Sequence, residues 1–289
     1  MTQGFGARLA VSWERYGRLC AGIDPHEHLL AAWGLNNDAA GAREFALRVV
    51  EASAGVIGTI KPQVAFFERF GSAGFVVLEE VFAAARAAGL LVIADAKRGD
   101  VGSTMAGYAS AWLSPGAPLE ADALTVNPYQ GVGSLAPALE LAQSAGKGLF
   151  VLAVTSNPEG SRQQRARVPA EEGSPDAAER TLGAHVLADV HAWNSAHRDP
   201  NGAPGSVGVV VGATLDLAPF GLTSGDVPVP VLAPGFGHQG ARLDGARERF
   251  GALADGVIVA ESRSLLDGGP SALAERIRAR AEEVRESFA

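Results

Sequence analysis

Continuous apolar runs recur along the whole chain, and segments of helical periodicity separate most of them. Apolar runs that do not alternate with polar residues are typical of parallel strands buried on both faces. The helical spacing appears at residues 42–54, 75–88, 134–145, 178–195 and 272–287. We predict strands at residues 19–24, 55–61, 90–97, 123–127, 148–156, 206–214, 229–235 and 255–261.

Eight alternating strand and helix units over about 250 residues predict a closed (β/α)8 TIM barrel of the α/β class. Residues 1–18 have the pattern of an extra amphipathic helix before the first strand. Neither a linker nor a shift in composition divides the chain, so we expect a single domain over residues 1–289. An open, doubly wound sheet is the alternative architecture.

Most of the predicted strands end in polar residues. In a TIM barrel the active site lies at the C-terminal ends of the strands, so polar side chains should gather there. These residues are Asp24, Lys61, Asp95, Lys97, Asn127, Thr155, Ser156 and Thr214, followed by Ser262 and Arg263 after the last strand. Loop sequences alone would supply some of them, so the pattern supports the barrel without identifying its chemistry.

The composition narrows the functional classes. The chain carries a formal net charge of −8, whereas a nucleic-acid surface needs a clustered excess of Lys and Arg. No apolar stretch approaches the ~18 residues of a membrane span, and residues 1–19 are too charged for a signal peptide. The single cysteine, Cys20, excludes an internal disulfide framework. We therefore expect a cytoplasmic protein with no membrane or nucleic-acid partner.

Lysine is rare in this chain. Only three of the 24 basic residues are lysines, and two of these, Lys61 and Lys97, end predicted strands. Asp95 and Lys97 are two positions apart, so a regular strand would point both side chains into the same cavity. Asp100 follows three residues later, and Lys61 ends the neighbouring strand. We expect an alternating array of Lys61, Asp95, Lys97 and Asp100.

Such an array has a chemical use. Opposite charges a few ångströms apart favour each other's ionised forms, so the carboxylates would keep Lys97 protonated. An ammonium group held in this way can stabilise a developing carbanion and then protonate it. A purely structural ring of salt bridges at the barrel mouth is the alternative explanation of the same pattern.

The lysine-containing segment resembles a known family. The run Asp95-Ala-Lys97-Arg-Gly-Asp100-Val-Gly-Ser-Thr104 is similar to the signature of the orotidine 5′-phosphate decarboxylases. The similarity continues at Ile23-Asp24-Pro25, Ile60-Lys61-Pro62, Thr155-Ser156-Asn157-Pro158, residues 234–240 and Ser262-Arg263-Ser264, and so covers nearly the whole chain. The length and the motifs resemble the longer bacterial subgroup, type 2, of that family.

The resemblance implies decarboxylation of orotidine 5′-phosphate to UMP and CO2, the last step of de novo pyrimidine nucleotide synthesis, with no metal and no organic cofactor. Lys97 would protonate C6 of the pyrimidine as CO2 leaves. Asp95 would lie against the substrate carboxylate and hold the lysines. Lys61 would bridge Asp95 and the ribose, and Asp24 would bind a ribose hydroxyl.

The resemblance also implies roles for residues beyond the charged array. Ser156 would hydrogen-bond the edge of the pyrimidine, and Gln239 and Arg263 would hold the 5′-phosphate. Asp100 and Thr104 would reach into the active site of the other subunit, which implies a homodimer with two shared sites.

Two features depart from the family pattern. Ser262 stands where the family often has glycine before the phosphate-binding arginine. The segment 158–180 is long and charged for a barrel loop, with Arg162, Arg165 and Arg167. We expect this segment to be a lid without regular structure that excludes water from the charged array.

Three alternative functions fit parts of the sequence. The run Gly235-Phe-Gly237-His-Gln-Gly240, with Glu261 further on, matches a dinucleotide-binding fingerprint, but only one βα unit could follow it. A metal-dependent sugar-phosphate decarboxylase or aldolase shares the Asp-x-Lys-x-x-Asp pattern, but the cation of Lys61 would repel Mg2+. A non-catalytic nucleotide-phosphate binder would keep the phosphate-binding residues without needing Lys97. The six histidines do not have metal-ligand spacing.

Overall fold

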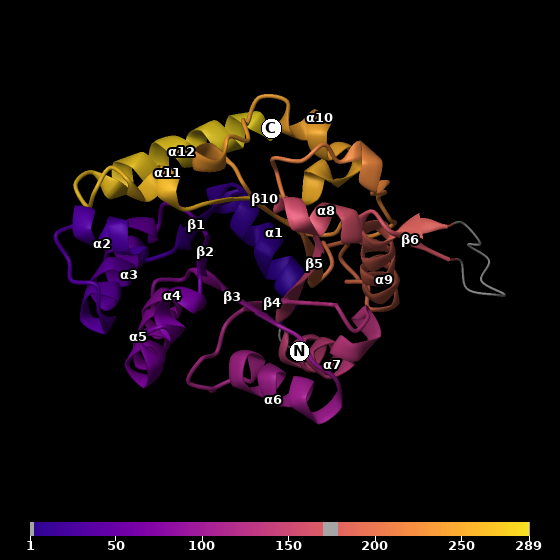
Figure 1. Cartoon of the computed structure of the whole chain (residues 1–289), viewed down its shortest axis with the longest axis horizontal. Coiled ribbons are helices and arrows are strands. Elements are labelled where there is room, and N and C mark those ends of the chain that lie inside the picture. The colour runs from indigo at the N-terminus through magenta and orange to yellow at the C-terminus, as the bar shows by residue number, and fades with distance from the viewer. Residues whose placement is uncertain (1–2, 170–178, 289) are drawn as a thin grey trace.

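The computed structural model describes residues 3–169 and 179–288, in which eight parallel strands close into a barrel covered by helices (Figure 1). Around the barrel the strands follow the order β1-β10-β9-β8-β5-β4-β3-β2. They are β1 (Leu19–Ile23), β2 (Thr59–Pro62), β3 (Leu91–Arg98), β4 (Ala123–Val126), β5 (Gly148–Val154), β8 (Val207–Val211), β9 (Val231–Pro234) and β10 (Val257–Glu261). The eight predicted strands and the TIM-barrel fold are confirmed, whereas the single domain over residues 1–289 stays a prediction.

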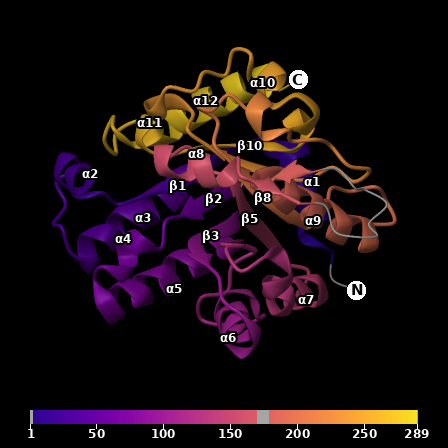
Figure 2. The ribbon, with the colours of Figure 1, turned by 45° about the vertical axis from the view of Figure 1, so that its right-hand side comes forward.

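The helices form a ring around the barrel, with α2 to α5 on one side, α6 and α7 next, then α9, and α10 to α12 closing the circle (Figures 1 and 2). The longer helices are α1 (Phe5–Tyr16), α3 (Ala39–Ser53), α5 (Gly71–Ala87), α6 (Gly102–Leu113), α7 (Ala136–Ala145), α9 (Leu182–Ala196) and α12 (Leu273–Ser287). The short ones are α2 (Glu27–Ala32), α4 (Ala65–Glu68), α8 (Pro158–Gln164), α10 (Ala246–Phe250) and α11 (Arg263–Leu266). Elements of four to seven residues are too short to show helical periodicity, so the sequence did not predict them.

Capping residues fix where two of the long helices begin. The carboxylate of Asp38 accepts a hydrogen bond from the backbone N–H of Gly41 at 2.7 Å, so α3 begins at Ala39. The hydroxyl of Thr181 accepts from the N–H of Ala184 at 3.1 Å, so α9 begins after Thr181. Helix α9 therefore starts four residues later than the periodicity predicts.

Helix α1 closes the N-terminal end of the barrel. Phe5 and Leu9 are fully buried and pack inside the barrel with Cys20 and Phe150. The rings of Phe5 and Phe150 meet edge to face with their centroids 5.9 Å apart. Burial raises the pKa of the Cys20 thiol to about 12, so the thiol is neutral in this core. With one end filled by apolar side chains, the polar residues gather at the other end, where the C-terminal ends of the strands lie.

The segment 158–180 differs from its prediction. Its described part contains helix α8 and the strand β6 (Arg167–Val168), which pairs antiparallel with β7 (Arg180–Thr181). The expected absence of regular structure is therefore wrong for this part, whereas the role of the segment as a lid stays a prediction. Residues 170–178 lie outside the described residues. The β6–β7 pair projects from the side of the barrel (Figure 1). Arg162 and Arg165 lie in and directly after α8, and Arg167 begins β6.

Among the described residues, no helix is both long enough and apolar enough to cross a bilayer.

Candidate active site

Three of the four predicted charged residues meet at the C-terminal end of the barrel. The Nζ atom of Lys61, on β2, lies 2.9 Å from Oδ2 of Asp95, on β3. The Nζ atom of Lys97 lies 2.6 Å from Oδ1 of the same carboxylate. Lys61 and Asp95 are buried, at 8% and 9% exposure, whereas the Lys97 side chain is 43% exposed. One carboxylate thus holds two ammonium groups, and Lys97 is the more exposed of the two.

Lys97 reaches Asp95 through an irregular backbone. Its φ is +48°, in the left-handed region, which costs a non-glycine residue about 1 kcal/mol or more. The pairing of β3 with β4 shifts register between Ala94 and Arg98, so Lys97 sits in a bulge. Its N–H donates to Oγ1 of Thr125 on β4 at 2.9 Å. The predicted meeting of Asp95 and Lys97 is confirmed, but the expected regular strand alternation is not its cause.

Thr125 is a residue that sequence reasoning missed. It is fully buried, and its hydroxyl donates to Oδ1 of Asp95 at 2.9 Å. Gln63, after β2, also lies against this carboxylate. With its amide nitrogen turned toward Asp95, it donates to Oδ2 at 2.5 Å and to the backbone carbonyl at 3.2 Å. A lone threonine in the apolar run of β4 was the available signal, because buried hydroxyls need a partner.

The charges set the protonation of the cluster. Burial alone would raise the pKa of Asp95, but the ammonium groups of Lys61 and Lys97 outweigh it and hold that pKa well below its usual range. Burial would likewise lower the pKa of Lys61, but the carboxylates of Asp95 and Asp24 raise it above its usual value. At neutral pH the cluster therefore holds an ionised Asp95 and a protonated Lys61.

Asp100 does not join this cluster within the chain. Its carboxylate accepts a hydrogen bond from the N–H of Val101 at 2.7 Å, and no ion pair joins it to a lysine of the described residues. Thr104 lies on the first turn of α6 and is exposed, and Val101 beside it is 53% exposed. The expected array of four charges is thus an array of three within one chain.

A cavity of about 240 Å³ adjoins the cluster on the side of β1, β9 and β10. Strand register brings its walls together, since Gly22 is paired with Lys61 and Ala21 with Glu261. The lining includes the predicted residues Asp24, Lys61, Gln239 and Arg263, together with Gly22, Glu261 and Ser262.

Two polar atoms in this lining have no protein partner. Oδ1 of Asp24 and Oγ of Ser262 are buried, and neither makes a hydrogen bond within the described residues. Buried polar atoms are normally hydrogen-bonded, so these two suit a polar ligand. Backbone N–H groups of a glycine-rich turn and the guanidinium of Arg263 are the groups that bind a phosphate. The cavity is therefore suited to an anionic, hydroxyl-bearing ligand.

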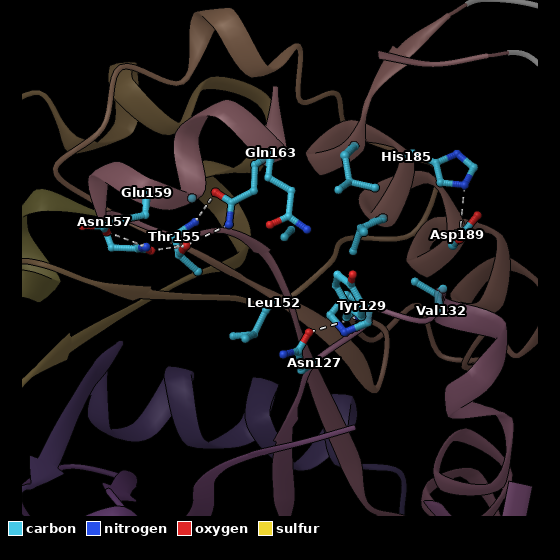
Figure 3. A pocket seen from close by; sticks show the side chains of 17 residues that line it. Asn127, Tyr129, Val132, Leu152, Thr155, Asn157, Glu159, Gln163, His185 and Asp189 are labelled. Carbon is cyan, nitrogen blue, oxygen red and sulfur yellow. Dashed lines mark hydrogen bonds and ion pairs between the residues drawn. The ribbon is translucent and has the colours of Figure 1, made fainter. Parts of the chain in front are cut away.

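A second cavity, of about 400 Å³, lies on the side of β4 and β5 (Figure 3). Asn127 and Leu152 form its floor, α8 forms one side, and His185 and Asp189 on α9 form the other. The predicted residue Ser156 is exposed at the end of β5 and is not part of either cavity lining.

A hydrogen-bond network anchors the segment that carries Ser156. The side chain of Gln164, at the end of α8, accepts from the N–H of Thr155 at 3.0 Å and donates to its Oγ1 at 2.8 Å (Figure 3). The Thr155 hydroxyl donates to Oδ1 of Asn157 at 2.7 Å. Gln164 was not predicted, because this contact joins two elements whose relative placement the sequence does not give.

The structure also bears on the glycine pattern and on the grouping of possible metal ligands. Gly235 lines the 240 Å³ cavity, and Gly237 begins the short 3-10 helix after β9, which accounts for the glycine pattern without a dinucleotide-binding half. Among the described residues, no three His, Cys, Asp or Glu side chains are grouped so that they could hold a metal ion.

Comparison with known proteins agrees with this geometry. Residues 17–274 match the model of the orotidine 5′-phosphate decarboxylase / HUMPS family. An orotidine 5′-phosphate decarboxylase of Streptomyces coelicolor is 51% identical over 276 residues, which cover 95% of this chain and 94% of that protein. One from Salinispora arenicola is 47% identical over 98% of this chain and 96% of that protein.

Solved structures agree as well. A structure from Streptomyces avermitilis is 48% identical, with a TM-score of 0.87, and covers 99% of this chain and 95% of that one. The OMP decarboxylase of Leishmania donovani is 30% identical, with a TM-score of 0.73 over 98% of this chain and 100% of that one. From the family match and the extent of these identities, the chain belongs to the orotidine 5′-phosphate decarboxylase / HUMPS family.

Proposed function

We propose that this chain is an enzyme that converts orotidine 5′-phosphate to UMP and CO2 in pyrimidine nucleotide synthesis. The relatives that carry this activity in their names share about half of its residues over more than nine tenths of its length. The observation that carries the proposal is the carboxylate of Asp95 held between Lys61 and Lys97 beside a cavity suited to a phosphate.

The substrate binds with its phosphate in the 240 Å³ cavity, where Gln239 and Arg263 hold it. The unpartnered Oδ1 of Asp24 accepts a hydrogen bond from a ribose hydroxyl. Lys61 lines this cavity and also contacts Asp95, so it joins the ribose site to the charged cluster. The pyrimidine then lies beside Lys97, and Ser156 hydrogen-bonds its edge.

The reaction breaks the bond between C6 and the carboxylate carbon, and the electron pair stays on C6. The ammonium group of Lys97 stabilises this developing charge and then donates its proton to C6. Asp95 cannot compete for that proton, because its pKa lies well below its usual range. Lys97 regains a proton from water, which its exposed side chain can reach. Asp95 thus holds the donor in place and faces the departing carboxylate.

The active unit is a homodimer in which Asp100 and Thr104 complete the partner's site. Thr104 is exposed and Asp100 is half-buried, and Asp100 makes no ion pair with the lysines of its own chain among the described residues. The apolar side chain of Val101, 53% exposed between them, suits burial against a second subunit. Dimerisation would then supply the fourth charge of the array.

The ultraviolet decay of orotidine 5′-phosphate, recorded with excess EDTA, tests the activity. The parent chain should convert the substrate to UMP without added metal, and Lys97→Ala should lower kcat by about a thousandfold or more. If Lys97→Ala still binds the nucleotide, the variant is folded, and its loss of activity reports on the chemistry. If the parent chain turned over only with Mg2+, the result would support the metal-dependent sugar-phosphate class. If it bound the nucleotide without turnover, the result would support a non-catalytic binder.

Mixing two inactive variants tests the shared sites. In a mixed dimer of Lys97→Ala and Asp100→Ala chains, one site receives an intact Lys97 and an intact Asp100. Half of the dimers are mixed, so about one quarter of the parental activity should return. If no activity returns although mixed dimers form, Asp100 does not act across the interface.

A further inference from the structure

The carboxylate of Glu261 ends β10 and is fully enclosed by the protein, with a side-chain exposure of 0%. Its Oε1 atom accepts from Nε and Nη2 of Arg280, on α12, at 2.8 and 2.5 Å. Its Oε2 atom accepts from Oγ of Ser264, on α11, at 2.6 Å. Both carboxylate oxygens are therefore committed to protein donors, and Glu261 cannot bind a ribose as a dinucleotide fingerprint would require.

Glu261 also lies against the glycine-rich turn after β9. A Cβ atom on Gly237 would come within 2.8 Å of Oε2 of Glu261 and within 2.6 Å of Ser264. Gly237 has φ +67°, so a side chain is disfavoured there for its backbone as well. Gln239 lies in the turn after β9, and Arg263 lies in the segment after β10. The carboxylate of Glu261 packs between the two and so limits how closely they approach each other.

The same carboxylate poses an electrostatic problem. Glu261 lines the 240 Å³ cavity together with Arg263, so its negative charge opposes any anion bound there. Arg280, on α12 and outside the cavity lining, offsets this charge through its ion pair with Glu261. Burial would lower the pKa of Arg280, but its hydrogen bonds to Glu261 and Glu283 raise it above the usual value. Arg280 therefore stays charged wherever the enzyme is folded.

We propose that Glu261 and Arg280, together called the β10–α12 pair, are positioning residues for the 5′-phosphate. The pair fixes the spacing between Gln239 and Arg263, and Arg280 cancels the charge that would otherwise repel the phosphate. The inference rests on the proposed function, because it assigns the 240 Å³ cavity to the phosphate of the substrate.

Three variants test the pair: Arg280→Met, Glu261→Gln, and the double variant. We measure KM for orotidine 5′-phosphate and the inhibition constants of UMP and of uridine, which lacks the phosphate. Arg280→Met leaves the negative charge of Glu261 without its counter-ion near the phosphate, so it should raise KM and the UMP constant by about tenfold or more. The uridine constant should change less than about twofold, because uridine does not reach the phosphate site.

The double variant separates the electrostatic role from a structural one. It removes both charges, so it should bind UMP better than Arg280→Met alone. If the pair served stability only, the double variant would bind UMP no better than the single variant, and the UMP-to-uridine ratio would stay at the parental value. The proposal is overturned if the double variant binds UMP no better than Arg280→Met, or if the UMP-to-uridine ratio stays at the parental value. The ratio compares two ligands on the same folded molecules, so partial unfolding does not alter it.

Arg278→Met is the matched control, since Arg278 is an exposed arginine on the same helix. It should leave KM and both inhibition constants at parental values. The decarboxylation assay of the parent chain distinguishes failure of the proposed function from failure of this inference. A parent chain that does not decarboxylate orotidine 5′-phosphate contradicts the proposed function, whereas an active parent whose pair variants keep parental constants contradicts this inference alone.

Discussion

Thr125 and Lys97 donate to the same oxygen of Asp95, at 2.9 and 2.6 Å, while the hydroxyl of Thr125 also accepts from the N–H of Lys97. One hydroxyl thus bonds both to the carboxylate and to the strained backbone of Lys97. Its acceptor and donor roles are both used, which fixes its orientation. A change at Thr125 should therefore act on the position of Lys97 instead of on the charge of the site.

Thr125→Val tests this link with almost no change in volume. Removing the hydroxyl leaves one oxygen of Asp95 and the N–H of Lys97 short of a partner. We expect kcat to fall about tenfold, with KM nearly unchanged, and stability to fall by about 1–3 kcal/mol. Steady-state kinetics and urea unfolding measure the two effects. Thr59→Val, at the start of β2, is the control for a buried threonine and should keep parental kcat. Parental kcat in Thr125→Val would show that Lys97 is held without it.

The low pKa of Asp95 predicts the pH dependence of stability. In the unfolded chain an aspartate titrates near ~3.9, whereas in the fold the pKa of Asp95 lies well below its usual range. Its contribution is therefore fully present above the unfolded pKa and is lost as pH falls toward the folded one. Lys61 has a raised pKa, so its contribution is present at neutral pH and is lost only in strong alkali.

Asp95→Asn should remove this acid dependence. The variant should be less stable than the parent at pH 7, because it leaves Lys61 buried without its carboxylate. Below about pH 4 the difference should shrink, since the parent loses the contribution of Asp95 there. Urea unfolding of both proteins between pH 3 and pH 7 measures the gap. A constant gap across this range would contradict the assignment.

The strands were predictable from sequence for a physical reason. Parallel strands covered by helices are apolar on both faces, and runs such as 206–214 and 255–261 leave little ambiguity. The convergence of Lys61 on Asp95 followed from the same reasoning, because neighbouring strands end at one edge. The bulge at Lys97 could not be predicted, since it depends on the register between β3 and β4, to which Thr125 belongs.

The contacts of the loops were harder to predict. Glu261 appeared in the sequence only as a poor match to a dinucleotide fingerprint, and its partner Arg280 lies 19 residues away on α12. Gln164 contacts Thr155 because α8 folds back over the end of β5. Neither contact has a periodicity or a spacing that a single sequence would reveal.

Gln164→Ala tests whether α8 supports the segment that carries Ser156, for which we propose binding of the pyrimidine. Losing both hydrogen bonds to Thr155 should loosen the segment that carries Ser156, and we expect KM to rise about threefold to tenfold. The proton transfer itself should be less affected, so kcat should change less than KM. Gln143→Ala, on the exposed side of α7, is the matched control and should keep the parental KM. Equal KM values in both variants would show that α8 does not position Ser156.

Phe5→Ala tests the plug that α1 places in the barrel. Phe5 is fully buried against Phe150, and Gly148 leaves room for its ring, since a Cβ there would lie 2.3 Å from it. Truncation removes most of this contact and leaves a cavity, so stability should fall by about 3–5 kcal/mol. The active site lies at the opposite end of the barrel, so KM and kcat of the folded enzyme should not change. Urea unfolding and kinetics measure both, with Val11→Ala, on the exposed face of α1, as the control. A changed kcat in Phe5→Ala would mean that packing at the closed end of the barrel is transmitted to Lys97.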